Sequence, residues 1–215
     1  MVALYIYFVI ICYLMIKIVC YWGQIRYGPS PNNIKLIKGS HTLILGQGGS
    51  GKSALATLLS EKNNIPIIRL DSLKFEAPGW KRRSFDEFKQ NYLNLSKAYF
   101  ENGFILEGIL SDPGAPEIER YLCELIRQGV FSNIIVVRTP VHIRVYRILR
   151  RSFYRFAGRE PQGSGGKESL KGIWTMLKNN ITNDIDNQIK LNNLPINNYQ
   201  VGLFGGIENF ILYHK

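Results

Sequence analysis

The chain has few of the residues that build disulfide frameworks and metal clusters. Its 215 residues include three cysteines and three histidines. Cys12 and Cys20 share one apolar run, and if that run is helical they stand roughly 12 Å apart along its axis, beyond disulfide reach. His41, His142 and His214 lack metal-ligand spacing. We therefore expect a reducing compartment, without a disulfide scaffold or a histidine-based metal centre.

Acidic residues are also scarce. The chain has 16 Asp and Glu against 27 Lys and Arg, which gives a formal net charge of +11. This balance favours anionic partners, among them nucleotides, nucleic acid and acidic lipid, and the total does not choose between them. A hydrophobic share of 46% excludes a disordered chain. The length suits one domain with a tail.

Charge is missing from the start of the chain, where an apolar run reaches Trp22 with Lys17 as its first charged residue. The run approaches the ~20 residues that a helix needs to cross a bilayer, and it lacks the basic start and the cleavage site of a secretory signal. We expect residues 1–28 to hold a transmembrane anchor and the start of a linker, which residues 29–40 complete. Basic residues after the span would keep the rest in the cytoplasm. The alternatives are a core helix with Lys17 at its edge and translated leader from a misassigned start codon.

The strongest motif is GQGGSGKS at residues 46–53, here called the glycine loop. It follows an apolar strand predicted at residues 41–45 and leads into a helix predicted at residues 52–62. This is the context of the Walker A motif, G-x-x-x-x-G-K-[ST]. Glycines let backbone N–H groups approach a phosphate chain, and the helix N-terminus adds more N–H groups; the alternative is a glycine-rich turn without a ligand. All eight residues are predicted to bind ATP: Gly46, Gln47, Gly48, Gly49, Ser50, Gly51, Lys52 and Ser53.

The rest of the chain alternates apolar and amphipathic segments. Strands that alternate with helices indicate a parallel sheet covered on both faces, with ligands at the carboxyl ends of the strands. We expect a three-layer α/β P-loop NTPase fold over residues 41–215, with a five-stranded parallel sheet, in addition to the N-terminal apolar helix. The further predicted strands are residues 65–71, 103–108, 133–140 and 199–204, and the further helices are residues 84–101, 115–128, 141–157 and 168–190.

The absence of certain motifs excludes some classes of P-loop protein. No L-S-G-G-Q run and no N-K-x-D motif is present, which argues against an ABC transporter ATPase and a small GTPase. Residues 41–175 resemble small nucleotide kinases, and in particular the adenylate-kinase-related topology-modulation (FlaR-like) P-loop proteins. The likeness rests on the glycine loop, IPIIRLDSLKF with the following PGW, GFILEG, and VVRTPVHIRVYRILRR. The chain departs from the family with Glu107 in place of Asp and Ile109-Leu110 in place of Asn-Tyr. The resemblance implies an ATP-binding phosphotransferase fold and leaves the acceptor open.

Two acids follow predicted strands and are the candidates for metal and acceptor chemistry. Lys52 is predicted to bridge the terminal phosphates, while the Ser53 hydroxyl and Glu107 hold Mg²⁺. Glu107 could instead activate an acceptor hydroxyl. Asp71 is predicted to bind or deprotonate the acceptor, with Asp112 as the substitute for either role. Acids at strand ends can also simply cap the next helix.

Arginines crowd residues 144–159. The six are Arg144, Arg147, Arg150, Arg151, Arg155 and Arg159. At about 100° per residue along a helix, all of them except Arg150 fall within an arc of roughly 120°. In nucleotide kinases such a segment clamps the transferring phosphoryl group, and we expect the same here, within a lid at about residues 141–168. Arg147, Arg151 and Arg155 are the predicted catalytic arginines, and the alternative is a basic face in solvent or on acidic lipid. The side expected to pack comprises Val145, Tyr146, Leu149, Phe153 and Phe156.

The segment GWKRRSFDEF at residues 79–88 lies where nucleotide kinases bind their acceptor. Its cationic residues could hold an acceptor phosphate while its aromatic residues stack on a base. The alternative is a basic surface turn. The residues concerned are Trp80, Lys81, Arg82, Arg83 and Phe85.

The combined prediction is a membrane-anchored, cytoplasm-facing P-loop kinase. It would transfer the γ-phosphate of MgATP to a small acceptor, foremost a nucleoside monophosphate, as adenylate kinases do. The alternative is a regulatory P-loop NTPase that binds nucleic acid or membrane through its basic face, with weak or no kinase activity. The sequence leaves the acceptor, the base preference and the oligomeric state open.

Overall fold

The structure is a computed structural model of the chain. It describes residues 36, 39–76, 81–110 and 114–156 and the single residues 174, 177, 178, 189 and 194, and for residues 153–156 it describes the backbone only. The predicted anchor within residues 1–28, the strand at residues 199–204, most of the helix at residues 168–190 and the lid beyond residue 156 lie outside the described residues. Within the described part of the chain, no helix has the length and apolar character to cross a bilayer.

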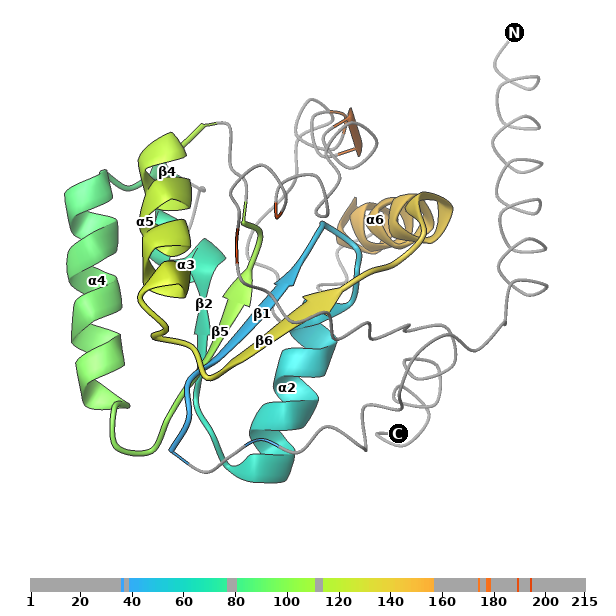
Figure 1. Cartoon of the computed structure of the whole chain (residues 1–215). Helices are drawn as coiled ribbons and strands as arrows, with labels where there is room; N and C mark the ends of the chain where they lie inside the picture. The colour runs from blue at the N-terminus through green and yellow to red at the C-terminus, as the bar shows by residue number, and fades with distance from the viewer. Residues whose placement is uncertain are drawn as a thin grey trace, which may run out of the picture.

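Four parallel strands form the main sheet of the described residues (Figure 1). They are β1 (Thr42–Gly46), β2 (Ile67–Arg69), β5 (Ile105–Gly108) and β6 (Asn133–Val137), in the order β2-β5-β1-β6. Strand β1 is central, with Leu43 opposite Leu106 of β5 and Ile134 of β6. Every residue of β1 and β5 is buried, as expected of apolar strands covered on both faces. The predicted parallel sheet is confirmed with four strands.

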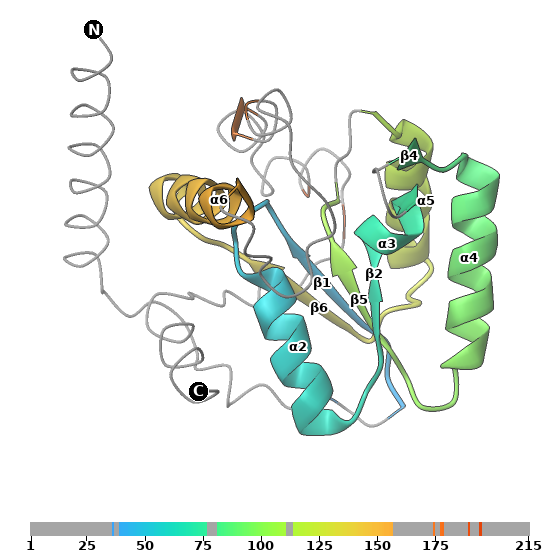
Figure 2. The ribbon, with the colours of Figure 1, turned by 180° about the vertical axis from the view of Figure 1, so that it is seen from behind.

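Helices cover both faces of this sheet, which confirms the three layers (Figures 1 and 2). Helix α2 (Lys52–Asn63) lies on one face, and α4 (Phe85–Ala98) and α5 (Pro116–Arg127) lie on the other. Successive side chains of a strand point to opposite faces. Accordingly, Leu43 and Leu45 join the core under α4 and α5, whereas Ile44 packs with α2.

The segment after β2 differs from the prediction. The strand expected over residues 65–71 ends at Arg69, and α3 (Leu70–Lys74) follows at once. Leu70, Leu73 and Lys74 are buried while Asp71 is exposed. This is the i, i+3, i+4 spacing of a helix, not the alternation of a strand. A short antiparallel pair, β3 (Phe75–Glu76) and β4 (Lys81–Arg82), then leads into α4.

Local signals place the later helices as predicted. Ser84 and Glu87 form a capping box at the start of α4, which satisfies two N–H groups at the helix end. Helix α6 (Val141–Phe156) begins directly after Pro140, close to the predicted range. It lies at the carboxyl end of β1, beside the glycine loop (Figure 2).

Candidate functional site

The glycine loop joins the central strand β1 to helix α2, as the motif predicted. Gly49 and Gly51 adopt φ angles of 74° and 93°, a left-handed region that residues with a Cβ atom avoid. A Cβ on Gly49 would lie 2.6 Å from the main-chain oxygen of Arg144 in α6. A Cβ on Gly46 would lie 2.5 Å from Ser50 Oγ. The motif glycines are thus required by backbone conformation and by close approach.

The loop presents an anion-binding helix end. Gly51 is the N-cap of α2, no side chain caps this end, and the first turn carries no acidic residue. The first N–H groups of the helix are therefore left for a ligand, and the helix dipole favours a negative one. Lys52 is largely buried, with 8% of its surface exposed, while Ser53 is exposed. The predicted phosphate and metal ligands of the loop stand together at this point.

Glu107 belongs to β5, the strand that lies between β1 and β2. It pairs with Ile44 of β1, and by strand alternation it shares the sheet face of Ile105, which packs with α2. Glu107 is 4% exposed, and within the described part of the chain its Oε2 atom has no hydrogen-bond partner. A buried carboxylate oxygen without a partner is costly unless a ligand supplies one. This face of the sheet also carries the glycine loop.

We had predicted Asp71 at the end of a strand. The structure instead places it in the first turn of α3. It is exposed, and the N-cap of α3 is Arg69, without a side-chain cap. The alternative role as a helix cap is therefore not what the structure shows. The carboxylate lies two residues beyond the carboxyl end of β2, at the edge of the sheet where β1 leads into the glycine loop. Asp112, the substitute, is outside the described residues.

The arginine face of α6 packs, and this corrects the predicted orientation of the helix. Arg144 is 7% exposed and therefore buried, and Arg147 and Arg151 are partly buried. On the side that we expected to pack, Leu149 is 41% exposed. The side chain of Arg155 is outside the described residues. This side of the helix turns toward the protein, where Ile143 and Ile148 are also buried and where the glycine loop offers Arg147 two carbonyl oxygens.

Arg147 makes the contact that explains this orientation. Its Nη1 donates to the main-chain oxygens of Gly49 and Ser50, each at 3.2 Å. Thr139 Oγ1 donates to the same oxygen of Ser50 at 2.9 Å. The segment before α6 and the helix itself thus hold the outer part of the glycine loop. Sequence reasoning missed Thr139, and its position just before Pro140 is the only signal that could have drawn attention to it.

The predicted acceptor-binding segment is largely structural where the structure describes it. Arg83 Nη1 donates to the main-chain oxygens of Ser72, Leu73 and Phe75, at 2.6 to 3.3 Å, so it closes the end of α3. Arg82 lies over the ring of Phe75 at 5.0 Å. The aromatic ring of Phe85 packs edge-on against Tyr121 at 5.9 Å. This arrangement corrects the predicted phosphate contact of Arg83 and the base stacking of Phe85. Trp80 is outside the described residues.

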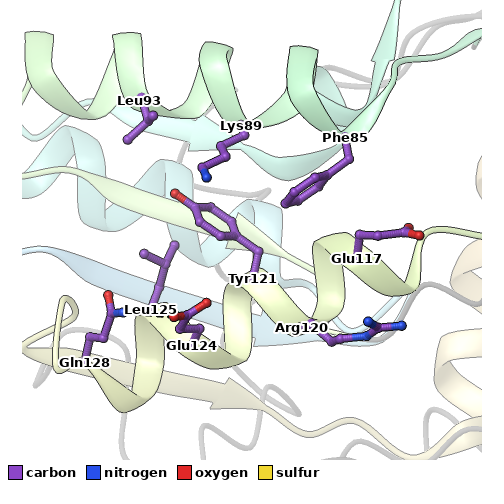
Figure 3. A pocket seen from close by; sticks show the side chains of 9 residues that line it. All are labelled: Phe85, Lys89, Leu93, Glu117, Arg120, Tyr121, Glu124, Leu125 and Gln128. Carbon is purple, nitrogen blue, oxygen red and sulfur yellow. Dashed lines mark hydrogen bonds between the residues drawn. The ribbon is translucent and has the colours of Figure 1, made fainter.

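A groove of about 590 Å³ between α4 and α5 lies apart from the glycine loop (Figure 3). In Figure 3, Phe85 and Lys89 of α4 point toward Tyr121 of α5, and Lys89 Nζ lies 5.7 Å from the Tyr121 ring centre. Both helices cover the sheet face opposite α2 (Figure 1). The groove is therefore a junction of two packed helices. Its lining is Phe85, Lys89, Leu93, Glu117, Arg120, Tyr121, Glu124, Leu125 and Gln128.

The fold and the site define a class of protein. A glycine loop joins the central strand of a parallel sheet to a helix whose N-terminus is free for an anion, and a buried acid stands on the neighbouring strand. The chain has an α/β fold with a parallel sheet and a glycine loop of the P-loop type.

No protein-family model matches the chain, and no curated protein matches it either. Three similar solved structures are TT1252 from Thermus thermophilus (19% identity, 65% of this chain and 94% of that one, TM-score 0.38), deoxyadenosine kinase from M. mycoides (14%, 80% and 96%, TM-score 0.41) and a gluconokinase from Sinorhizobium meliloti (12%, 82% and 98%, TM-score 0.35). Each is a distant likeness, and the assignment of class rests on the chain's own sheet and loop.

Proposed function

We propose that the protein is a P-loop phosphotransferase that moves the γ-phosphate of MgATP to a small acceptor, foremost a nucleoside monophosphate. The observation that carries the proposal is Glu107, a buried carboxylate with an unpartnered oxygen on the sheet face of the glycine loop. A loop that bound a nucleotide without a metal ion would not need such a group, because its burial is costly. Metal binding or activation of a hydroxyl group offsets that cost.

The residues present fit a magnesium nucleotide. The start of α2 has no side-chain cap and no acidic residue in its first turn, so its N–H groups are left for a phosphate chain. Lys52 would bind the terminal phosphates, and Ser53 and Glu107 would hold the ion, directly or through water. The ion, when bound, would neutralise charge on the phosphates. These roles are the ones that the sequence predicted.

Asp71 is the proposed acceptor residue. Its carboxylate is exposed at the carboxyl edge of the sheet, two residues beyond β2, and β2 is the neighbour of the strand that carries Glu107. An exposed acid at that edge can receive the proton of an acceptor hydroxyl or orient the acceptor. On this proposal Glu107 serves the metal and Asp71 serves the acceptor.

Arg147 and Arg151 are proposed to support the loop and the phosphoryl group, with Arg155 as a further candidate. Arg144 is buried and Arg147 is bonded to the loop, so neither of these two arginines belongs to a free basic surface. This weighs against the alternative in which the arginine face binds nucleic acid or lipid. The anchor at residues 1–28 and a cytoplasmic orientation remain predictions.

Activity is the direct test. The purified full-length chain is incubated with MgATP and a panel of nucleoside monophosphates, nucleosides and small alcohols, and products are separated by chromatography. Lys52→Ala should lower product formation by about 100-fold or more, because it removes a positive donor from the developing charge. Lys62→Ala, in the last turn of the same helix, should leave the rate unchanged.

Clear binding of MgATP with no product from any acceptor would refute the transferase and favour the regulatory alternative. That alternative predicts binding to DNA or anionic vesicles that weakens steeply with salt, and loss of this binding in the Arg147→Glu and Arg151→Glu variants.

A further inference from the structure

The side chain of Gln47 has no partner inside the glycine loop. Gln47 is 5% exposed, and its buried Nε2 atom makes no hydrogen bond to any residue that the structure describes. A buried donor left unpaired costs about 1–3 kcal/mol, and such groups in native proteins are rare. The motif explains only the main chain at this position, because the cradle is made of backbone N–H groups. The buried carboxamide needs a separate reason.

The main chain of Gln47 is fixed, whereas its carboxamide is not. Its main-chain oxygen accepts from the N–H of Ser50 at 3.1 Å, which closes the turn of the loop. The residue stands between Gly46, the last residue of β1, and the glycines that follow. Gln47 therefore belongs to the loop that offers its N–H groups to a ligand. No described residue supplies an oxygen for the Nε2 atom.

Two other unpartnered polar atoms, Ser50 Oγ and Glu107 Oε2, differ in chemistry from Gln47 Nε2. Ser50 Oγ lies 2.5 Å from where a Cβ on Gly46 would stand, so it faces the main chain of β1. Glu107 Oε2 only accepts hydrogen bonds when ionised. Nε2 of Gln47 is a neutral donor, and Arg147 is already bonded to loop oxygens. The neutral N–H group of Gln47 can only donate, so its suitable partner in an anion-binding loop is a ligand oxygen that accepts a hydrogen bond.

We propose that Gln47 Nε2 donates a hydrogen bond to an oxygen of a bound phosphoryl group, which makes Gln47 a specificity-determining residue. The phosphoryl group belongs to the donor nucleotide or to a monophosphate acceptor, and the chemistry recognised is the same in both. The inference rests on the proposed function only in taking a nucleotide as the ligand. It does not require that transfer takes place.

Two substitutions separate the donor from the shape of the side chain. Gln47→Leu keeps a similar volume without a donor, and Gln47→Glu places a carboxylate oxygen where the donor stands. The matched control is Gln90→Leu in α4, because Gln90 is exposed and its Nε2 already donates to Asn94 Oδ1 at 3.0 Å.

The experiment measures the affinities of the full-length chain for ATP, ADP and AMP, each with Mg²⁺, by calorimetry. Gln47→Leu should weaken about tenfold the nucleotides that carry the contacted phosphoryl group, since a hydrogen bond to a charged group is lost. If only the affinity for ATP falls, Gln47 contacts the γ-phosphoryl group. If the affinities for ATP and ADP fall, it contacts the β-phosphoryl group. If only the affinity for AMP falls, it contacts the phosphoryl group of the acceptor. Gln47→Glu should weaken the same nucleotides further, and Gln90→Leu none of them.

The melting temperature without ligand gives a second readout. It should stay equal or rise in Gln47→Leu, because an unpaired buried donor is removed. Unchanged affinities, a loss for all three nucleotides that Gln47→Glu does not increase, or no binding of any of them by the unmodified chain would overturn the inference. Selective loss in a protein that forms no phosphorylated product would leave the inference standing and refute the proposed transferase.

Discussion

Gly49 combines a left-handed backbone with a close neighbour. Its φ is 74°, and a Cβ there would approach the main-chain oxygen of Arg144 to 2.6 Å. Gly129, after α5, has a similar φ of 70° but nothing within 4 Å of the same position. Comparing Gly49 with Gly129 therefore separates the cost of a left-handed backbone from the cost of a steric clash.

We predict that Gly129→Ala costs about 1–2 kcal/mol of stability from the left-handed backbone alone. Gly49→Ala should cost this amount and about 1–3 kcal/mol more, because α6 must move away from the loop. Urea denaturation of both variants measures the difference. Only Gly49→Ala should also weaken MgATP binding, as titration calorimetry would show. Equal costs for the two variants would contradict the close approach of α6.

At the scale of elements, α6 shows that sequence periodicity predicted the helix but not its buried face. The pattern of residues 141–157 predicted a helix, and Val141–Phe156 is one. The face was wrong because a helical wheel ranks side chains by polarity alone. Here the glycine loop presents main-chain oxygens to the helix, and Arg147 binds them. Burial of arginine then becomes favourable, while Leu149 remains exposed.

Arg147 is therefore expected to position the glycine loop before any nucleotide binds. Arg147→Met should weaken MgATP binding about tenfold, since hydrogen bonds that involve a charged group contribute about 1.5–3 kcal/mol. In the ligand-free protein, the N–H groups of residues 49–52 should also exchange faster with deuterium. Arg150→Met on the exposed side of α6 is the control.

Hydrogen exchange separates two roles for Arg147. A residue that only clamped the transferring phosphoryl group would leave exchange in the ligand-free loop unchanged. That result, with a normal affinity for MgATP, would assign Arg147 to the phosphoryl group and would contradict its role in the loop.

At the scale of the whole molecule, the ends of the sheet have different tasks. The carboxyl end carries the glycine loop, Glu107 and, just beyond β2, Asp71. The amino end carries His41, whose ring stacks on Phe104 at 4.3 Å between ring centres. Its main-chain oxygen accepts from the N–H of Ser132 at 3.0 Å. His41 thus ties strands together at a distance from the site.

The pH dependence of stability should report on His41. Burial lowers the pKa of His41 below its ordinary value of 6.5 in the folded protein. The unfolded chain then takes up the proton more readily than the folded protein once the pH falls through about 6.5. The free energy of unfolding should therefore fall with decreasing pH below this value and not vary from this cause above it.

His41→Phe keeps the stacking and removes the titration. Urea denaturation between pH 5 and 8 (roughly, the range in which histidine titrates) should show a shallower acid decline for this variant than for the unmodified chain. MgATP binding should be alike in both at neutral pH, because His41 lies at the other end of the sheet. Parallel declines would refute the assignment.

The sequence by itself determined the strands that carry the site and the position of the glycine loop between a strand and a helix. Continuous apolar runs and the Walker A spacing are local properties, and Gly46 and Lys52 occupy the places that the motif requires. Sequence also placed Glu107 at the end of an apolar strand, on the same edge of the sheet as the glycine loop, because parallel strands bring their carboxyl ends together.

Only the tertiary structure decided which side chains face the loop. It turned Arg147 onto main-chain oxygens, fixed Arg83 at the end of α3 and left Nε2 of Gln47 without a partner. Partners of these groups come from distant parts of the chain, so no local pattern encodes them. The free energy of burying a polar group depends on the hydrogen bonds that meet it there, and those exist only once the layers have packed.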